Sequence, residues 1–296
     1  MSLEWDPELN DRLLSLQLLA REILWGISAG MQRSNQVTKA IEFVEHREYQ
    51  PGDPISSIDW RIFARTDRVM IKRQQADTEG NLILVLDASA DMESTTEGRP
   101  DFEKSKLGRA ITALAAFTLY AKKRAEPVGL LVIGGSGLEH RWIPPSRRSA
   151  AVIFYTLATV QGAERANLAE GFATLLSKLT KPSILFIASD WMEEPSDWGK
   201  PLEALSSMRH DIRGLHLYSE VEWSFDIPES IRLYGQESGR EIPLQRDQIR
   251  RQFLEEVEKY KKEVIQCAAK AKAVWSYAPL EEPLVFPLLR LLKGVG

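Results

Sequence analysis

The chain is poor in the residues that build disulfide frameworks and cysteine-based metal sites. Its 296 residues include a single cysteine, Cys267, which excludes an internal disulfide and a zinc site made of cysteines. With 38 Lys plus Arg against 42 Asp plus Glu, the formal net charge is −4. That balance offers no general excess of positive charge to neutralise phosphates. We therefore expect no nucleic-acid partner.

Long hydrophobic runs are also missing. The longest apolar windows, such as residues 110–120 and 129–135, fall short of the roughly 18 apolar residues that a helix needs to cross a bilayer. The first ten residues carry Glu4, Asp6 and Glu8, whereas a secretory signal begins with basic residues and continues with an apolar stretch. We expect no membrane span, no export and a cytoplasmic location.

Motifs of several enzyme classes are absent as well. The sequence contains neither a P-loop lysine motif nor a His-Glu-x-x-His zinc motif. The glycine-rich segment 133–137 lacks the last glycine of a nucleophile elbow, because Leu138 stands at that place, and it favours a hairpin turn instead. The four histidines are scattered, and we expect them at the surface or at caps: His46, His140, His210 and His216.

Strands and helices alternate along most of the chain. Apolar runs without polar alternation predict strands buried on both faces at residues 81–86, 128–133, 183–188 and 212–218, with a further strand at 138–143. Helical spacing of apolar residues predicts helices at 101–123, 149–160, 167–179 and 201–208. This order predicts an α/β fold with a doubly wound, mostly parallel sheet and helices on both faces, as in Rossmann-like proteins.

Two further regions flank this core. Residues 1–77 are expected to form an N-terminal elaboration packed on the main body, with a helix at 9–30 and an irregular or strand-rich part at 39–75. Residues 78–296 are expected to form the main domain with a C-terminal extension. In that extension we expect strand-like pieces at 231–234 and 241–244 and a long helix at 245–270.

Polar side chains follow two of the predicted strands. Asp87, Ser89 and Asp91 come after the strand that starts at residue 81, and Ser189 and Asp190 follow the strand that starts at residue 183. Ligands of open α/β sheets bind at the carboxyl ends of the strands, and hard oxygen donors suit Mg²⁺ or Mn²⁺. Taken singly, each aspartate also fits a helix cap or a strand-end turn. Both interpretations stay open.

These motifs resemble known families. Asp87 and Ser89 after a buried strand, with Asp190 after another, are similar to the metal-ion-dependent adhesion site of von Willebrand factor A domains. More specifically, four motifs resemble the bacterial family called domain of unknown function 58. They are Arg-Glu-Tyr-Gln-Pro-Gly-Asp at 47–53, Ser-Ile-Asp-Trp-Arg at 57–61, Ala-Arg at 64–65 and Leu-Asp-Ala-Ser at 86–89. The resemblance covers about residues 25–290.

The resemblance implies a von Willebrand factor A-like fold without established catalysis. It implies a non-enzymatic protein-interaction module with a divalent-metal site of the adhesion type, holding Mg²⁺, Mn²⁺ or Ca²⁺. It also implies a partner, a MoxR-type AAA+ ATPase, for which such proteins act as adaptors in chaperone-like assembly. The metal ligands that it implies are Asp87, Ser89, Asp91, Asn167 and Asp190.

Two of these ligands depart from the family pattern. Asp91 stands where the family has Ser, and Asn167 is the best match for the usual Thr. Three carboxylates would give a bound Mg²⁺ a net negative surrounding, so we expect tighter metal binding and a weaker attraction for an acidic partner. In the alternative, Asp91 turns outward as a helix cap and the site holds no ion.

The segment from Arg47 to Arg65 has two interpretations. Its arginines and acidic residues can form a structural ion-pair network, with the aromatic side chains packed on the sheet. Alternatively, the segment is a docking surface for the partner. The candidate partner-binding residues are Arg47, Tyr49, Asp53, Asp59, Trp60 and Arg65.

An enzymatic function remains as an alternative. A Mg²⁺-dependent phosphohydrolase would use Asp87 as its nucleophile. Phosphatases of the haloacid dehalogenase type need a second Asp two residues further on, and Ser89 occupies that place.

Overall fold

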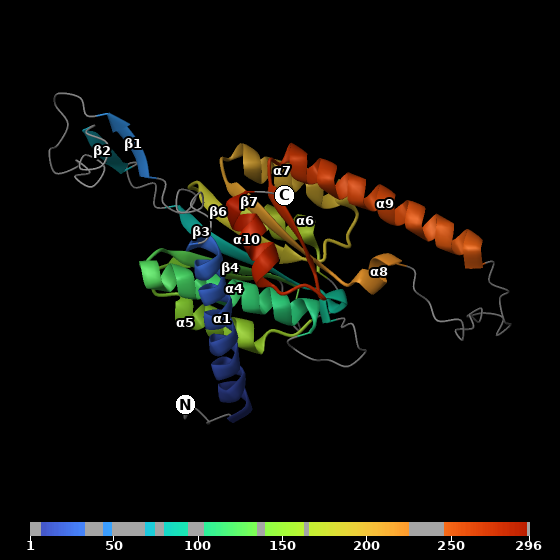
Figure 1. Cartoon of the computed structure of the whole chain (residues 1–296), viewed down its shortest axis with the longest axis horizontal. Helices are drawn as coiled ribbons and strands as arrows, with labels where there is room; N and C mark the ends of the chain where they lie inside the picture. The colour runs from blue at the N-terminus through green and yellow to red at the C-terminus, as the bar shows by residue number, and fades with distance from the viewer. Residues whose placement is uncertain are drawn as a thin grey trace.

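The computed structural model describes the chain from an N-terminal to a C-terminal helix. The described residues are 7–32, 44–48, 69–74, 80–93, 104–134, 140–162, 166–224 and 246–294. Helix α1 spans Pro7–Gln32. Strands β1 (Val44–Glu48) and β2 (Met70–Gln74) pair antiparallel in a small sheet of their own (Figure 1). The expected N-terminal helix is present, and the described residues within 39–75, which are 44–48 and 69–74, lie almost entirely in strands.

The central sheet has six strands in the order β5-β4-β3-β6-β7-β8. Their bounds are β5 Arg141–Ser146, β4 Val128–Gly134, β3 Asn81–Ala88, β6 Ser183–Ser189, β7 Asp211–Tyr218 and β8 Val274–Pro279. All neighbouring pairs are parallel except β4 and β5, which are antiparallel. After β3, the chain adds β4 and β5 on one side of β3 and then β6, β7 and β8 on the other side. This strand order is that of a doubly wound α/β fold, which confirms the expected class.

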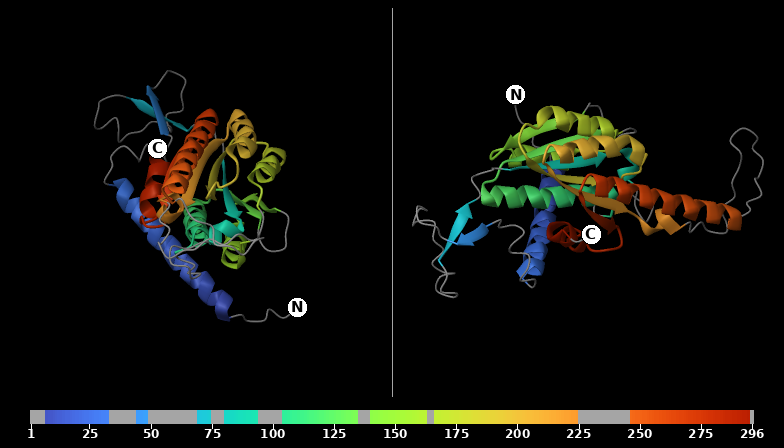
Figure 2. Two further views of the ribbon diagram at one scale, coloured as in Figure 1. Left: turned by 90° about the vertical axis from the view of Figure 1, so that its right-hand side faces the viewer. Right: turned by 90° about the horizontal axis from the view of Figure 1, so that it is seen from above.

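Helices cover both faces of the sheet. One apolar cluster joins the sheet to α1, α4 (Lys106–Arg124), α5 (Ala150–Thr159) and α10 (Val285–Lys293). The other joins the opposite face to α6 (Leu168–Lys178), α7 (Pro195–Ser207) and α9 (Arg246–Lys270). Figure 2 shows the sheet between these two layers of helices.

Strand β3 shows why its sequence has no polar alternation. Its side chains point alternately to the two faces, and both faces are covered. Leu84 and Leu86 belong to the cluster with α4, whereas Ile83 and Val85 belong to the cluster with α6. All four are completely buried. The middle of the sheet is therefore a rigid base for the polar residues that follow it.

Two helix starts differ from the sequence predictions, and two elements were not predicted. The helix expected from residue 101 begins at Lys106, because the Ser105 side chain accepts a hydrogen bond from the Gly108 N–H and caps it. The helix expected at 201–208 begins at Pro195 and contains Pro201. Strand β8 and helix α10 were not predicted. The strand-like pieces expected at 231–234 and 241–244 lie outside the described residues.

Candidate functional site

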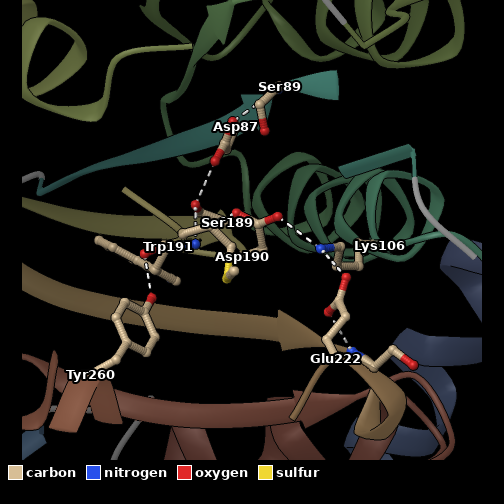
Figure 3. Close-up of polar contacts among 10 residues, drawn as sticks. Asp87, Ser89, Lys106, Ser189, Asp190, Trp191, Glu222 and Tyr260 are labelled. Atoms are coloured by element: carbon tan, nitrogen blue, oxygen red, sulfur yellow. Dashed lines mark hydrogen bonds and ion pairs between the residues drawn. The ribbon is translucent and has the colours of Figure 1, made fainter. Parts of the chain in front are cut away.

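The carboxyl ends of β3 and β6 lie side by side in the middle of the sheet. The two strands pair in parallel register up to Leu86 and Ala188, so the polar residues that follow them meet at one edge. We call this region the carboxyl edge and define it by Asp87, Ser89, Ser189, Asp190 and Lys106 (Figure 3). It lies where the strand order changes direction, which is the usual place for ligands in such sheets.

Asp87 is held from both sides at this edge. The residue is buried, with only 3% of its surface exposed. One carboxyl oxygen, Oδ1, accepts a hydrogen bond of 3.0 Å from the Ser89 N–H, and Oδ2 accepts one of 2.5 Å from the Ser189 hydroxyl. The Ser189 oxygen in turn accepts a bond of 2.8 Å from the Trp191 N–H. The prediction that residues of β3 and β6 meet here is confirmed for Asp87, Ser89 and Ser189.

The surroundings of Asp87 change its protonation. Burial, and after it the nearby charge of Asp190, raise the pKa of Asp87 to about 7, although hydrogen bonds from Ser189 and Ser89 act in the opposite direction. The ionised form of this carboxyl group is therefore less favoured than that of an exposed aspartate.

Asp190 is ion-paired with a buried lysine. The Lys106 Nζ lies 2.8 Å from Asp190 Oδ2 and 2.8 Å from Glu222 Oε1. The second oxygen of Asp190, Oδ1, accepts a bond of 3.2 Å from the Met192 N–H. The second oxygen of Glu222 accepts one of 3.0 Å from the Ser219 N–H. Figure 3 shows Lys106 between the two carboxylates.

Lys106 keeps its charge in this position. Burial by itself lowers the pKa of the amine, but the charge of Asp190 and the hydrogen bonds to Asp190 and Glu222 outweigh it, and the pKa lies above its ordinary value. The carboxyl edge thus contains a permanent ammonium group. Glu222 belongs to the short helix α8 (Glu220–Ser224), so the ion pairs join α4, the end of β6 and α8.

The sequence analysis missed Lys106 and Glu222. A signal for the lysine was present: Lys106, Ala110, Ala113 and Phe117 follow the helical period, and all four are buried. A lysine in line with an apolar helix face needs a partner inside the protein. For Glu222, which precedes a stretch without a clear pattern, we find no comparable signal.

Two other predicted metal ligands, Asp91 and Asn167, lie in or at the start of helical segments. Asp91 lies in the short 3₁₀-helix η2 (Ala90–Glu93) with an exposed side chain. Asn167 caps α6, because its side chain accepts a hydrogen bond of 2.9 Å from the Glu170 N–H. The assignment of these five residues as ligands of one ion stays a prediction. Within the described residues, no group of three or more His, Cys, Asp or Glu side chains is arranged to hold a metal ion.

The predicted docking segment lies largely outside the described residues. Arg47 belongs to β1, where its backbone is in register with Ile71 of β2. The remaining candidates lie outside the described ranges: Tyr49, Asp53, Asp59, Trp60 and Arg65. Their assignment stays a prediction.

Trp191 follows Asp190 at the carboxyl edge and has a strained backbone conformation. Its backbone φ is 57°, in the left-handed region that bulky residues rarely adopt. Its carbonyl accepts a hydrogen bond from the Tyr260 hydroxyl of α9, and its indole Nε1–H donates to the Leu215 carbonyl at 3.3 Å. Its ring centroid lies 4.9 Å from that of Trp198 and 4.4 Å from that of Trp275. We call these three rings the tryptophan cluster.

His216 is buried beside the same edge. It pairs in register with Ser189 and is completely buried, contrary to the expectation of a surface or capping histidine. Burial, and after it the charge of Lys106, lower the pKa of His216 to about 3. The ring is therefore neutral at physiological pH.

The fold is a doubly wound α/β domain that carries clustered polar residues at its carboxyl edge. The family model described as "Protein of unknown function DUF58" matches residues 45–263, and the chain belongs to this family. The resemblance of the sequence to this family is thereby confirmed. None of the helices within the described residues has the length and apolar character of a membrane span.

Relatives and solved structures with similarity to the chain carry little functional description. "Uncharacterized protein Rv1480" from Mycobacterium tuberculosis is 28% identical over 237 residues, which cover 79% of this chain and 73% of the relative. BatB from Bacteroides thetaiotaomicron, a conserved hypothetical protein, has a TM-score of 0.47 and 10% identity, and the match covers 72% of this chain and 97% of BatB. The SpRpn10 VWA domain has a TM-score of 0.39 and 10% identity over 70% of this chain and 91% of that domain.

Proposed function

We propose that the chain is a non-enzymatic protein-interaction module that contacts its partner at the carboxyl edge of the sheet. One observation carries the proposal: the polar groups of this edge are already bonded to one another. Asp87 is buried with hydrogen bonds to both oxygens, and Lys106 is bonded to two carboxylates. Side chains that are already held in place lose little conformational entropy when a partner binds. This arrangement supports recognition of a protein surface by the carboxyl edge.

The same geometry disfavours the phosphohydrolase alternative. A nucleophilic aspartate has to reach a phosphorus atom with a free, ionised oxygen. Asp87 is 3% exposed, and Ser189 and Ser89 donate to its two oxygens. The absence of turnover on a generic phosphoester, with Mg²⁺ present, is therefore the expected result. Turnover that disappears in Asp87→Asn contradicts the proposal.

The partner in this proposal is a MoxR-type AAA+ ATPase, with the chain as its adaptor in chaperone-like assembly in the cytoplasm. This part of the proposal comes from the family resemblance of the motifs at 47–65 and 86–89. The same resemblance makes the segment from Arg47 to Arg65 a second candidate contact region. An interaction measurement with the purified ATPase tests both.

Met192 provides a direct test of the carboxyl edge. It follows Asp190 and Trp191 at the end of β6, and the residue is 54% exposed. An exposed methionine is an adaptable apolar contact in protein interfaces. We expect Met192→Ala to weaken binding of the ATPase by about tenfold without loss of stability, as measured by calorimetry.

The chain offers a matched control for this variant. Met208 is 41% exposed and precedes β7, so it lies at the opposite, amino edge of the sheet. Met208→Ala is expected to leave binding unchanged. Docking at the carboxyl edge is contradicted if both substitutions weaken binding equally or if neither substitution weakens it.

The divalent ion predicted from the sequence stays a prediction. Calorimetric titration of the metal-stripped protein with Mg²⁺, Mn²⁺ and Ca²⁺ tests it, together with Asp87→Ala and Asp190→Ala. Saturable binding that is lost in both variants supports an ion held by both aspartates. The interaction proposal does not depend on this result, because the edge is bonded through its own side chains.

A further inference from the structure

Lys106 occupies an unfavourable place for a positive charge. It is the first residue of α4, a helix of 19 residues, and the positive end of the helix dipole lies at that terminus. It is also 1% exposed, and a buried ammonium is costly unless it is paired and hydrogen-bonded. Both effects disfavour lysine here, so the carboxylates that bind it must compensate for them.

Two carboxylates provide this compensation. Asp190 and Glu222 each lie 2.8 Å from the Lys106 Nζ, and the side chain of Asp190 is 4% exposed whereas that of Glu222 is 29% exposed. The ammonium is a compact charge with three hydrogen-bond donors. It therefore joins three segments that are far apart in the sequence, in the manner of a small bound cation.

A divalent ion and this ammonium compete for the same carboxylate. Mg²⁺ requires oxygen ligands at about 2.0–2.1 Å in a nearly octahedral arrangement. Both oxygens of Asp190 are already bonded, one to Lys106 and one to the Met192 N–H. Binding of an ion to Asp190 would bring two positive charges next to a buried ammonium.

We propose that the ammonium of Lys106 is the built-in cation of the carboxyl edge and excludes a divalent ion from Asp190. The inference disagrees with the ligand role that the family resemblance implies for Asp190. It concerns the same edge as the proposed function but does not need the partner. The edge then keeps its geometry with or without divalent metal.

Thermal unfolding and Mn²⁺ electron paramagnetic resonance test the inference. The wild-type Tm is expected to be the same in chelator and in excess Mg²⁺, Mn²⁺ or Ca²⁺. Lys106→Ala is expected to lower the Tm by about 5–15 °C in chelator, because it leaves Asp190 buried without its counter-charge. Divalent metal should restore about half of that loss. The double variant Lys106→Ala/Asp190→Asn should show no such recovery.

Two further variants make the outcome decisive. Lys123→Ala changes an exposed lysine on the same helix and is expected to show neither the loss nor the metal response. Lys106→Gln retains a hydrogen-bond donor and serves if Lys106→Ala does not fold. Recovery by metal in the Lys106 variants supports the inference, and its absence in both overturns it.

The wild-type protein gives a test that needs no folded lysine variant. Mn²⁺ binding to the wild type that disappears in Asp190→Asn overturns the inference, whereas no binding supports it. Binding that survives Asp190→Asn also supports it, because Asp190 is then not a ligand. A partner that binds only with divalent metal through Asp190 overturns this inference and leaves the proposed function standing. Failure to bind any ATPase overturns the proposed function and leaves this inference standing.

Discussion

His216 shows how one buried side chain can determine the response of the protein to acid. Its ring is enclosed by aromatic neighbours, with centroid distances of 5.1 Å to Tyr277, 5.4 Å to Trp223 and 5.9 Å to Trp275. A hydrogen bond to the backbone of Asp190 favours the protonated ring, but burial outweighs it. The nearby cations Lys106 and Lys261 both disfavour its protonation. The folded protein therefore resists a proton that the unfolded chain accepts readily.

The sign of the pH dependence follows from this difference. The pKa of His216 is lowered from 6.5 to about 3 on folding. Its contribution to stability is complete above the unfolded pKa and is lost as the pH falls from 6.5 towards 3. Between about pH 7.5 and pH 5, this group alone should reduce the free energy of unfolding by about 2 kcal/mol.

His216→Phe removes this contribution and keeps an aromatic ring in place. Urea denaturation at both pH values should show the wild type losing about 2 kcal/mol more than the variant on acidification. Equal losses in the two proteins contradict the assignment of this acid sensitivity to His216.

At the scale of the elements, α6 approaches β4 so closely that a glycine is needed. A Cβ atom added to Gly171 of α6 would lie 2.2 Å from the Ile133 Cδ1 and 2.6 Å from its Cγ1. Ile133 is completely buried in β4, so a shift of its side chain would disturb packed neighbours. The absence of a side chain at residue 171 therefore sets the distance between helix and strand.

Gly171→Ala measures this contact. Alanine gains about 1 kcal/mol over glycine from helix propensity, but overpacking costs about 1–3 kcal/mol. We expect a net loss of about 1–2 kcal/mol in the free energy of unfolding by denaturant titration. In an Ile133→Ala background, the same substitution should become neutral or stabilising. Destabilisation of equal size in both backgrounds contradicts the close contact.

The sequence predicted the elements that have strong and regular patterns. Strands β3, β4, β6 and β7 are continuous apolar runs, and their burial on both faces produces such runs directly. Strand β8 is a short segment, Val274–Pro279, with mixed aromatic and polar residues. Helix α10 contains Pro287, which weakens a helical pattern. Both are formed by packing against the rest of the protein, which local sequence does not express.

The sequence predicted the location of the carboxyl edge but not the ion pairs formed there. Asp87, Ser89, Ser189 and Asp190 follow strands and could be placed together by topology alone. The pairing of Asp190 depends on Lys106, which is 84 residues away in the sequence. The hydrogen bond of the Asn167 side chain is made at the start of a helix. Contacts over such separations are decided by the folded chain and have no local signature.

At the scale of the whole molecule, the C-terminal segment is fastened back onto the domain by arginines. Arg109 of α4 donates hydrogen bonds of 2.5 Å to the carbonyls of Leu280 and Glu282. Arg290 of α10 binds the Glu282 carboxylate through two nitrogens at 2.9 Å and 2.6 Å. These contacts hold the turn between β8 and α10 against the centre of the helical layer.

Arg109→Met should loosen this segment while keeping an apolar stem in the core. Loss of two charge-assisted hydrogen bonds to part-buried carbonyls is expected to cost about 2–3 kcal/mol. Hydrogen exchange should become faster in α10 than in α6. The matched control is Arg124→Met at the exposed end of α4, whose pair with Glu126 is expected to contribute less than about 1 kcal/mol. Uniform acceleration of exchange in both helices contradicts a local fastening.

The tryptophan cluster makes the carboxyl edge visible to optical spectroscopy. Trp191 directly follows Asp190, and the rings of Trp198 and Trp275 are stacked at an interplanar angle of 12° with centroids 6.3 Å apart. Indoles this close couple their electronic transitions. A displacement at Asp190 should therefore change the near-ultraviolet circular dichroism and the intrinsic fluorescence together. Docking of a partner at this edge can then be followed in stopped-flow experiments on the unlabelled protein.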